Sequence, residues 1–135
     1  MYFLDADICI EFMRGRIPEG YSLLQRSDPS IFAIPSVVVG ELMTGALKSN
    51  DPKSNRFLLD CFLAPFQVVA FDEKCAEKYA QVRAYLESKG LKIGPKDTQI
   101  AAMVLVHSAV LITNNVRELK RVPGLQVESW QVSTL

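Results

Sequence analysis

The chain has 135 residues, of which 49% are hydrophobic and 22% are charged, and this composition is typical of an ordinary globular protein. The length predicts one domain over residues 1–135, large enough for a buried core. The 15 basic and 15 acidic residues give a formal net charge of zero, so no global field would attract nucleic acid or a membrane. A contact with nucleic acid would therefore need a local basic cluster.

The cysteines and the N-terminus indicate the compartment. Cys9, Cys61 and Cys75 are odd in number, far apart and set in apolar segments. They predict reduced, packed thiols in a cytoplasmic protein, without disulfides or a cysteine-based zinc site. The N-terminus lacks a basic region and soon reaches Asp5 and Asp7, so we expect no signal peptide. No apolar run is long enough to span a membrane, and we expect no membrane partner.

Short apolar segments alternate with helical ones along the chain. We expect strands at 2–4, 31–34, 67–71, 110–113 and 125–127. We expect helices at 6–14, 18–26, 36–47, 52–63, 72–89, 98–108 and 116–120, with Ser36 and Asp72 as N-caps of the third and fifth. Short apolar strands separated by helices predict an α/β fold, with a parallel central sheet and helices on both faces.

The helix expected at 98–108 is preceded by an acid on its buried side. Ile100, Ala101, Val104 and Leu105 have the spacing of a buried helical face, and Asp97 lies one turn earlier on the same stripe. A single Asp at a helix start is usually an N-cap that accepts backbone N–H bonds. Asp97 therefore indicates a functional site only if other acids join it.

Other polar residues are expected at the same edge of the sheet. Asp5 ends the first strand, and Asn114 and Asn115 follow the strand at 110–113. Sites in open parallel sheets form outside the carboxyl ends of the strands. The helix that begins near Asp97 leads into the strand at 110–113, so this carboxylate should lie at that edge too.

Glu41 adds a third carboxylate. It lies in the second turn of the helix that follows the strand at 31–34, beside the apolar stripe rather than opposite it. The early turns of that helix should stay near the carboxyl edge of the sheet. Asp5, Glu41 and Asp97 are thus expected to converge, with Asp7 as a potential fourth acid.

A group of carboxylates resists ionisation unless a cation is present. Oxygen-only ligands favour Mg²⁺, with Mn²⁺ as the alternative, over Zn²⁺. The single histidine, His107, lies near the C-terminus of an apolar helix and gives no basis for a Ser–His–Asp or Cys–His mechanism. No glycine-rich phosphate-binding loop is present, which argues against a nucleotide cofactor.

Basic residues flank the same acids. Each cluster taken alone is typical of a solvated helix end. Together, clusters that border an acidic metal centre fit a ligand with a phosphodiester backbone. These residues are Lys89, Lys92 and Lys96 before Asp97, Arg117, Lys120 and Arg121 after Asn115, and Arg14 and Arg16 after the first helix.

The ordered motifs resemble a known family. They are Leu4-Asp5-Ala6-Asp7, Gly40-Glu41-Leu42-Met43-Thr44-Gly45, Ile93-Gly94-Pro95-Lys96-Asp97 with Ile100-Ala101-Ala102, and Thr113-Asn114-Asn115-Val116-Arg117-Glu118. Their order is similar to that of the PIN-domain, VapC-type toxin ribonucleases, over essentially the whole chain. The resemblance implies a Mg²⁺-dependent endoribonuclease that cuts RNA, with structured RNA such as tRNA as a candidate. It also implies neutralisation by a VapB-type antitoxin and a homodimer.

The resemblance also implies roles for the acids. Asp5, Glu41 and Asp97 would be the catalytic metal-site residues, with Asp5 and Asp97 holding the ion and Glu41 positioning its water shell. Asn115 and Glu118 would orient waters or a second ion.

Two positions depart from the family pattern. Asp7 stands where such toxins commonly have Asn, and Asn115 stands where the wider PIN pattern has a fourth Asp. Glu118, one turn later, is a candidate for the missing carboxylate. The sequence therefore leaves open whether one or two metal ions bind.

Two alternatives remain at this point. Asp5 and Asp7 after a strand also resemble the start of haloacid-dehalogenase-type phosphohydrolases, in which the first Asp is the nucleophile and the second an acid–base. Cys9, in place of the Thr or Val of that family, and the lack of paired late aspartates argue against it. The other alternative is a non-catalytic binding module whose acids only cap helices.

Overall fold

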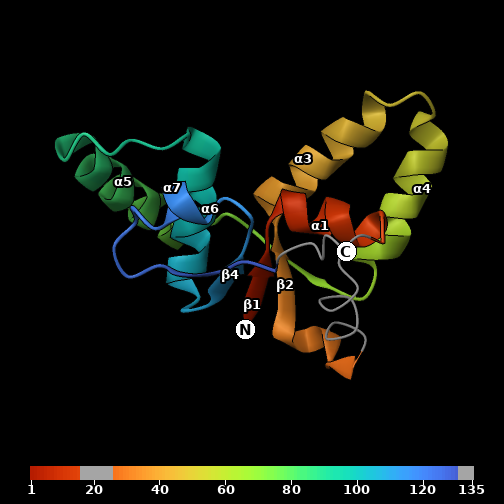
Figure 1. Cartoon of the computed structure of the whole chain (residues 1–135), viewed down its shortest axis with the longest axis horizontal. Coiled ribbons are helices and arrows are strands. Elements are labelled where there is room, and N and C mark those ends of the chain that lie inside the picture. Colours follow the sequence, from red (N-terminus) through yellow and green to blue (C-terminus); the bar gives the residue numbers. More distant parts are fainter. Residues whose placement is uncertain (16–25, 131–135) are drawn as a thin grey trace, which may run out of the picture.

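A computed structural model of the chain describes residues 1–15 and 26–130. Its centre is a five-stranded parallel sheet with the strand order β3-β2-β1-β4-β5. The strands are β1 (Tyr2–Leu4), β2 (Phe32–Pro35), β3 (Gln67–Val69), β4 (Val110–Ile112) and β5 (Gln126–Glu128). Figure 1 shows the sheet between two groups of helices. The first strand in the sequence therefore lies in the middle of the sheet.

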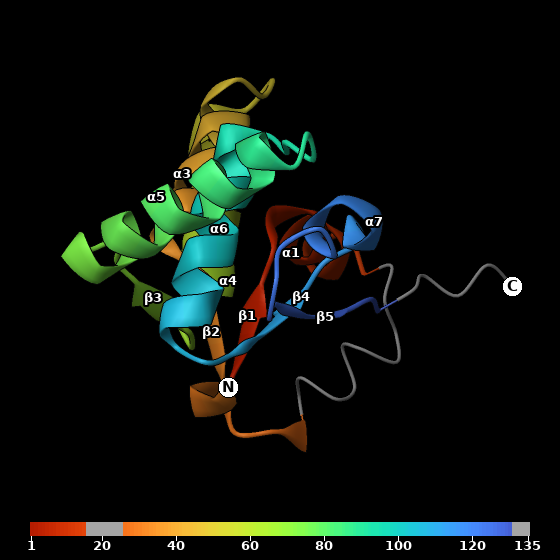
Figure 2. The ribbon, with the colours of Figure 1, turned by 90° about the vertical axis from the view of Figure 1, so that its left-hand side faces the viewer.

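The helices cover both faces of the sheet. They are α1 (Ala6–Met13), α3 (Ser36–Leu47), α4 (Pro52–Leu63), α5 (Glu73–Ser88), α6 (Pro95–Val106) and α7 (Val116–Leu119). Figure 2 shows α5, α6 and α7 in front of the sheet and α1, α3 and α4 behind it. This division follows from right-handed crossovers, because the chain moves outward from β1 to β3 and then returns past β1 to β4 and β5. The predicted α/β fold is confirmed, and the helix expected at 18–26 falls almost wholly outside the described residues.

The boundary between β2 and α3 differs from the prediction by one residue. Ile31 belongs to a 3₁₀ turn, Pro29–Ile31, capped by the Asp28 side chain, which accepts the Ser30 N–H at 2.9 Å. The strand then includes Pro35, one residue beyond its predicted end at 34. Pro35 also occupies the N-cap position of α3, and no side chain caps that helix. The prediction that Ser36 is the cap was wrong, because Ser36 is already the first helical residue.

Helix α6 begins three residues earlier than predicted. Gly94 is its N-cap and Pro95 its first residue, a position where the missing N–H of proline costs no hydrogen bond. Asp97 thus lies in the first turn of α6 rather than before the helix. By contrast, the predicted cap of α5 is confirmed, because the Asp72 carboxylate accepts the Cys75 N–H at 3.0 Å.

The core consists of apolar side chains from the three central strands, from Val69 of β3 and from the helices on both faces. Cys9 and Cys75 are buried free thiols, whereas Cys61 is free and exposed on α4, so the expectation of three packed thiols was wrong for Cys61. Within the described ranges, no helix is both long and apolar enough to cross a membrane.

Leu119 is the buried residue of the four-residue helix α7, and its side chain is completely buried in the core. Leu119→Ala should lower the free energy of unfolding by about 2–5 kcal/mol, because it removes buried methyl groups and leaves a cavity. Urea denaturation measures this change. Leu58→Ala on α4, where Leu58 is 58% exposed, is the control and should change stability by less than about 0.5 kcal/mol. Equal effects of the two substitutions would contradict the placement of α7 against the core.

Candidate metal centre

Asp5 lies where the central strand β1 ends. Its N–H donates to the Ile112 carbonyl at 3.0 Å, so the β1–β4 pairing extends to this residue. One carboxylate oxygen accepts the Ala6 N–H at 2.8 Å and the other accepts the Thr113 hydroxyl at 2.7 Å. Asp5 is therefore both the N-cap of α1 and a buried acid at the carboxyl edge of the sheet.

Thr113 is a residue of this site to which the sequence analysis assigned no role. It is completely buried just after β4. Its hydroxyl oxygen donates to Asp5 and accepts the Asn115 N–H at 3.1 Å. Thr113 thus orients the Asp5 carboxylate and holds the turn that carries Asn115. The signal in the sequence was a hydroxyl residue at the end of an otherwise apolar strand, next to two asparagines.

Asp97 makes none of the backbone bonds of a helix cap. Gly94 occupies the cap position, and an Asp97 oxygen instead accepts the side-chain N–H of Asn115 at 3.0 Å. The same amide nitrogen lies 3.4 Å from a Glu118 oxygen. The structure therefore does not support the alternative that Asp97 is an ordinary N-cap. The structure brings Asp97, Asn115 and Glu118 together.

The electrostatic environment of Asp97 and Asp7 disfavours their charged forms. Burial raises the pKa of Asp97 above its ordinary value, and the nearby Asp5 and Glu118 carboxylates raise it further. Burial also raises the pKa of Asp7, and Asp5 adds to the effect. Each carboxylate thus resists ionisation because it is partly removed from water and surrounded by like charge. A bound cation would relieve both penalties.

Glu41 extends from α3 and meets Lys96 of α6. Its Oε2 lies 2.9 Å from the lysine Nζ, while its Oε1 is buried and has no hydrogen-bond partner among the described residues. The Glu41 side chain is 23% exposed and that of Lys96 is 54% exposed. The hydrogen bond to Glu41 raises the pKa of Lys96, so the ammonium stays charged. The sequence placed Lys96 in a basic cluster but did not reveal this partner.

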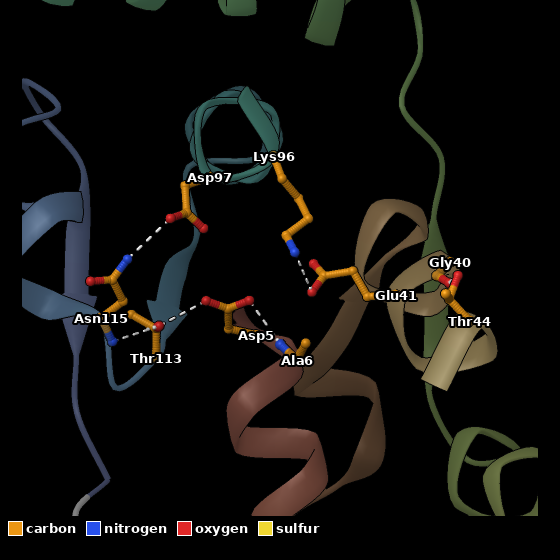
Figure 3. Close-up of polar contacts among 9 residues, drawn as sticks. All are labelled: Asp5, Ala6, Gly40, Glu41, Thr44, Lys96, Asp97, Thr113 and Asn115. Carbon is orange, nitrogen blue, oxygen red and sulfur yellow. Dashed lines mark hydrogen bonds and ion pairs between the residues drawn. The ribbon is translucent and has the colours of Figure 1, made fainter. Parts of the chain in front are cut away.

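The three predicted carboxylates face one space at the edge of the sheet. Figure 3 shows Asp5, Glu41 and Asp97 pointing toward this space from the end of β1, from α3 and from α6. In the described part of the chain, however, no three acidic, histidine or cysteine side chains are grouped tightly enough to hold a metal ion as they stand. Each acid is held by a neighbour, namely Thr113 for Asp5, Asn115 for Asp97 and Lys96 for Glu41.

The donors nevertheless fit a hard divalent cation. They are carboxylate oxygens, which suit Mg²⁺ or Mn²⁺. Two observations support this fit. One is the buried and unpartnered Oε1 of Glu41. The other is the raised pKa of Asp97, whose charge lacks full compensation.

The family of the chain follows from its sequence. A model of the PIN-domain family matches residues 2–125. The chain belongs to the PIN-domain family. Ribonuclease VapC2 of Rickettsia felis is 37% identical over 132 residues, which cover 96% of this chain and 98% of that protein. The tRNA(fMet)-specific endonuclease VapC of Salmonella typhimurium is 33% identical over 129 residues, covering 96% and 97%.

Solved structures agree with this assignment. The crystal structure of VapBC2 from Rickettsia felis, bound to a DNA fragment from their promoter, matches with a TM-score of 0.86 at 36% identity, over 96% of this chain and 98% of that chain. DNA-bound VapBC from Salmonella typhimurium matches with a TM-score of 0.86 at 32% identity, with the same coverage. Within the PIN-domain family, this chain is therefore a nuclease of the VapC type, and the predicted resemblance is confirmed.

The raised pKa of Asp97 predicts the pH dependence of stability. A carboxyl group whose pKa is higher in the folded protein stabilises the fold only while protonated, and this stability is lost as the pH rises through the folded pKa. Asp97→Asn should therefore raise the melting temperature in EDTA at pH 7, by about 2–4 °C. The gain should shrink toward zero as the pH falls below the ordinary aspartate range. Thermal melts across this pH range measure the difference.

Asp72→Asn is the matched control. The pKa of Asp72 is lowered, mainly by its hydrogen bond from the Cys75 N–H. Its charged form therefore stabilises the fold, and this contribution is present at neutral pH and lost on acidification. Asp72→Asn should consequently give no gain at pH 7. A gain equal to that of Asp97→Asn would contradict the proposed crowding of charge at the site.

Proposed function

We propose that this chain is a Mg²⁺-dependent endoribonuclease that hydrolyses RNA phosphodiester bonds and acts as the toxin of a toxin–antitoxin pair. The observation that carries the proposal is that Asp5, Glu41 and Asp97 face one space at the carboxyl edge of the sheet. These acids come from three separate elements of a PIN-domain chain whose relatives are named as ribonucleases. Mn²⁺ is the alternative ion.

The residues of the site have different roles in the proposed reaction. Asp5 and Asp97 would hold the ion, and Glu41 would position its water shell. When bound, the ion would lower the pKa of a water molecule and polarise a phosphoryl oxygen. Thr113 fixes the orientation of Asp5 through its 2.7 Å hydrogen bond. The Asn115 side-chain amide donates to Asp97 and lies close to Glu118. Glu118 is thus held beside Asp97, where it would orient water at the same site.

The names of the relatives support a substrate class and a partner. The Salmonella typhimurium protein is named as specific for tRNA(fMet), and we infer that structured RNA such as tRNA is the substrate class here. The Rickettsia felis and Salmonella typhimurium structures are VapBC complexes, and we infer a VapB-type antitoxin as partner. A homodimer that acts in the cytoplasm completes the proposal.

The alternative of a phosphohydrolase fits the geometry less well. In such a phosphohydrolase Asp7 would be the acid–base, and its carboxylate oxygens would need to be free to exchange a proton with the substrate. Its two oxygens instead accept the Ile8 N–H at 2.7 Å and the Asn114 N–H at 3.0 Å. Asp7 thus links the start of α1 to the turn after β4 through these two hydrogen bonds. A binding module with acids that only cap helices is not favoured either, because Asp97 caps no helix.

Asp5→Asn tests the nuclease assignment. The substitution should lower Mg²⁺-dependent RNA cleavage by more than about 100-fold, because loss of an outer-shell partner alone costs about 10–100-fold. Cleavage of a tRNA transcript under single-turnover conditions measures the rate. Asp72→Asn is the matched control, since Asp5 and Asp72 both cap helices and Asn caps as well as Asp. The control should cut at the wild-type rate.

An Asp5→Asn variant with wild-type cleavage would show that Asp5 serves only as a helix cap. Equal losses in both variants would assign the effect to helix capping rather than to chemistry. A wild-type protein that cuts equally well in EDTA would contradict the role of a divalent ion.

A further inference from the structure

The proposed mechanism does not use the ion pair between Lys96 and Glu41, which joins α6 to α3 across the site. Lys96 precedes Asp97 in the first turn of α6, yet the two side chains diverge. Lys96 extends toward α3 and meets Glu41, while Asp97 extends toward Asn115 (Figure 3). One turn of one helix therefore carries both a metal-site acid and a cation that reaches another acid of the same site.

The pairing satisfies only half of the Glu41 carboxylate. Its Oε2 lies 2.9 Å from the Lys96 ammonium, and its Oε1 is buried without a partner among the described residues. An unpartnered buried oxygen lowers stability. The carboxylate points into the space that Asp5 and Asp97 also face. Glu41 is thus arranged to accept a further cation from that space.

Glu41 cannot serve the lysine and the divalent ion equally well. As the side chains stand, the acids are not grouped tightly enough to hold a metal ion in the described part of the chain, so Glu41 must approach the other two. A divalent ion on Glu41 would then lie close to the Lys96 ammonium, and two cations at such a distance repel each other. Lys96 is more than half exposed and can leave by rotating its side chain into solvent.

We propose that Lys96 competes with the divalent ion for Glu41 and thereby lowers the affinity of the site for metal. The inference rests on the proposed metal site, to which it adds a positioning residue. With little divalent ion present, the ammonium compensates the charge of Glu41 and holds the carboxylate on the α6 side. When the ion binds, Glu41 exchanges one cation for the other. Lys96 therefore raises the Mg²⁺ concentration at which the site fills.

Isothermal titration calorimetry with Mg²⁺ tests this competition without measuring activity. Lys96→Gln should bind Mg²⁺ about two- to fivefold more tightly than the wild type, which is the range expected for loss of a partly exposed ion pair. Lys96→Arg keeps the charge and should restore wild-type or weaker binding. Lys92→Gln removes a positive charge four residues before Lys96 that, in the described part of the chain, forms no ion pair with Glu41 and instead acts on Glu87, so it should leave the dissociation constant unchanged.

A double-mutant cycle shows whether Lys96 acts through Glu41. In a Glu41→Gln background, Lys96→Gln should change the Mg²⁺ dissociation constant no further, because the shared partner has been removed. An equal gain in both backgrounds would mean a general field effect on Asp5 and Asp97, and would overturn the proposal. Unchanged or weaker Mg²⁺ binding by Lys96→Gln in the wild-type background would overturn it as well.

The same titrations separate this inference from the proposed function. A wild-type protein that binds Mg²⁺ and cuts RNA, with no gain in affinity in Lys96→Gln, overturns the competition alone. A wild-type protein that neither binds a divalent ion nor cuts RNA overturns both.

Discussion

The parallel pairing of β1 with β4 at the centre of the sheet is the constraint on which the site depends. It places the end of β1 beside the end of β4, so that the Asp5 N–H bonds the Ile112 carbonyl and the Asp5 carboxylate meets the Thr113 hydroxyl. Thr113 then holds the turn that carries Asn115, and Asn115 bonds Asp97. Two strands that are far apart in the sequence thus bring two acids and their supports to one edge. Helix α6 supplies the second acid because it begins at that edge before it leads back to β4.

The same arrangement concentrates negative charge where water is partly excluded. Burial and neighbouring carboxylates raise the pKa of both Asp7 and Asp97, which is typical of a functional site rather than of an optimised surface. The buried Cys9 thiol is close enough to these acids to feel their charge. Burial, together with the Asp5 charge, raises the pKa of this thiol well above the ordinary value. The thiol therefore stays neutral at physiological pH and packs as a small apolar group. Apart from Lys96, the groups that bond these acids are neutral donors, which leave the negative charge of the acids in place.

Much of this could be predicted from the sequence, for identifiable physical reasons. Short apolar strands between amphipathic helices allow few arrangements other than a parallel sheet covered on both faces. Asp97 was recognisable because an acid on the apolar stripe of a helix is unfavourable unless something compensates it. Ser36 was predicted wrongly because the preceding Pro35 adopts the cap conformation itself. A serine directly after a proline does not show whether the serine is the cap or already the first helical residue.

Other features depend on contacts that local patterns cannot reveal. Thr113 is a common strand residue, and only the register between β1 and β4 shows that its hydroxyl serves Asp5. The Lys96 partner lies on a different helix on the opposite face of the sheet, so sequence spacing could assign Lys96 only to a basic cluster. Cys61 lies in an apolar segment of α4 but is exposed, because the side of that helix on which it lies does not face the core.

The central claim is that Asp5 and Asp97 bind one divalent ion at the carboxyl edge of the sheet. Anomalous diffraction from crystals of the protein grown with Mn²⁺ tests it most directly. We expect an anomalous peak between these two carboxylates, with Glu41 turned toward it. A Mn²⁺-saturated protein without a peak in this space, or with its peak elsewhere, would show that Asp5 and Asp97 do not hold the ion.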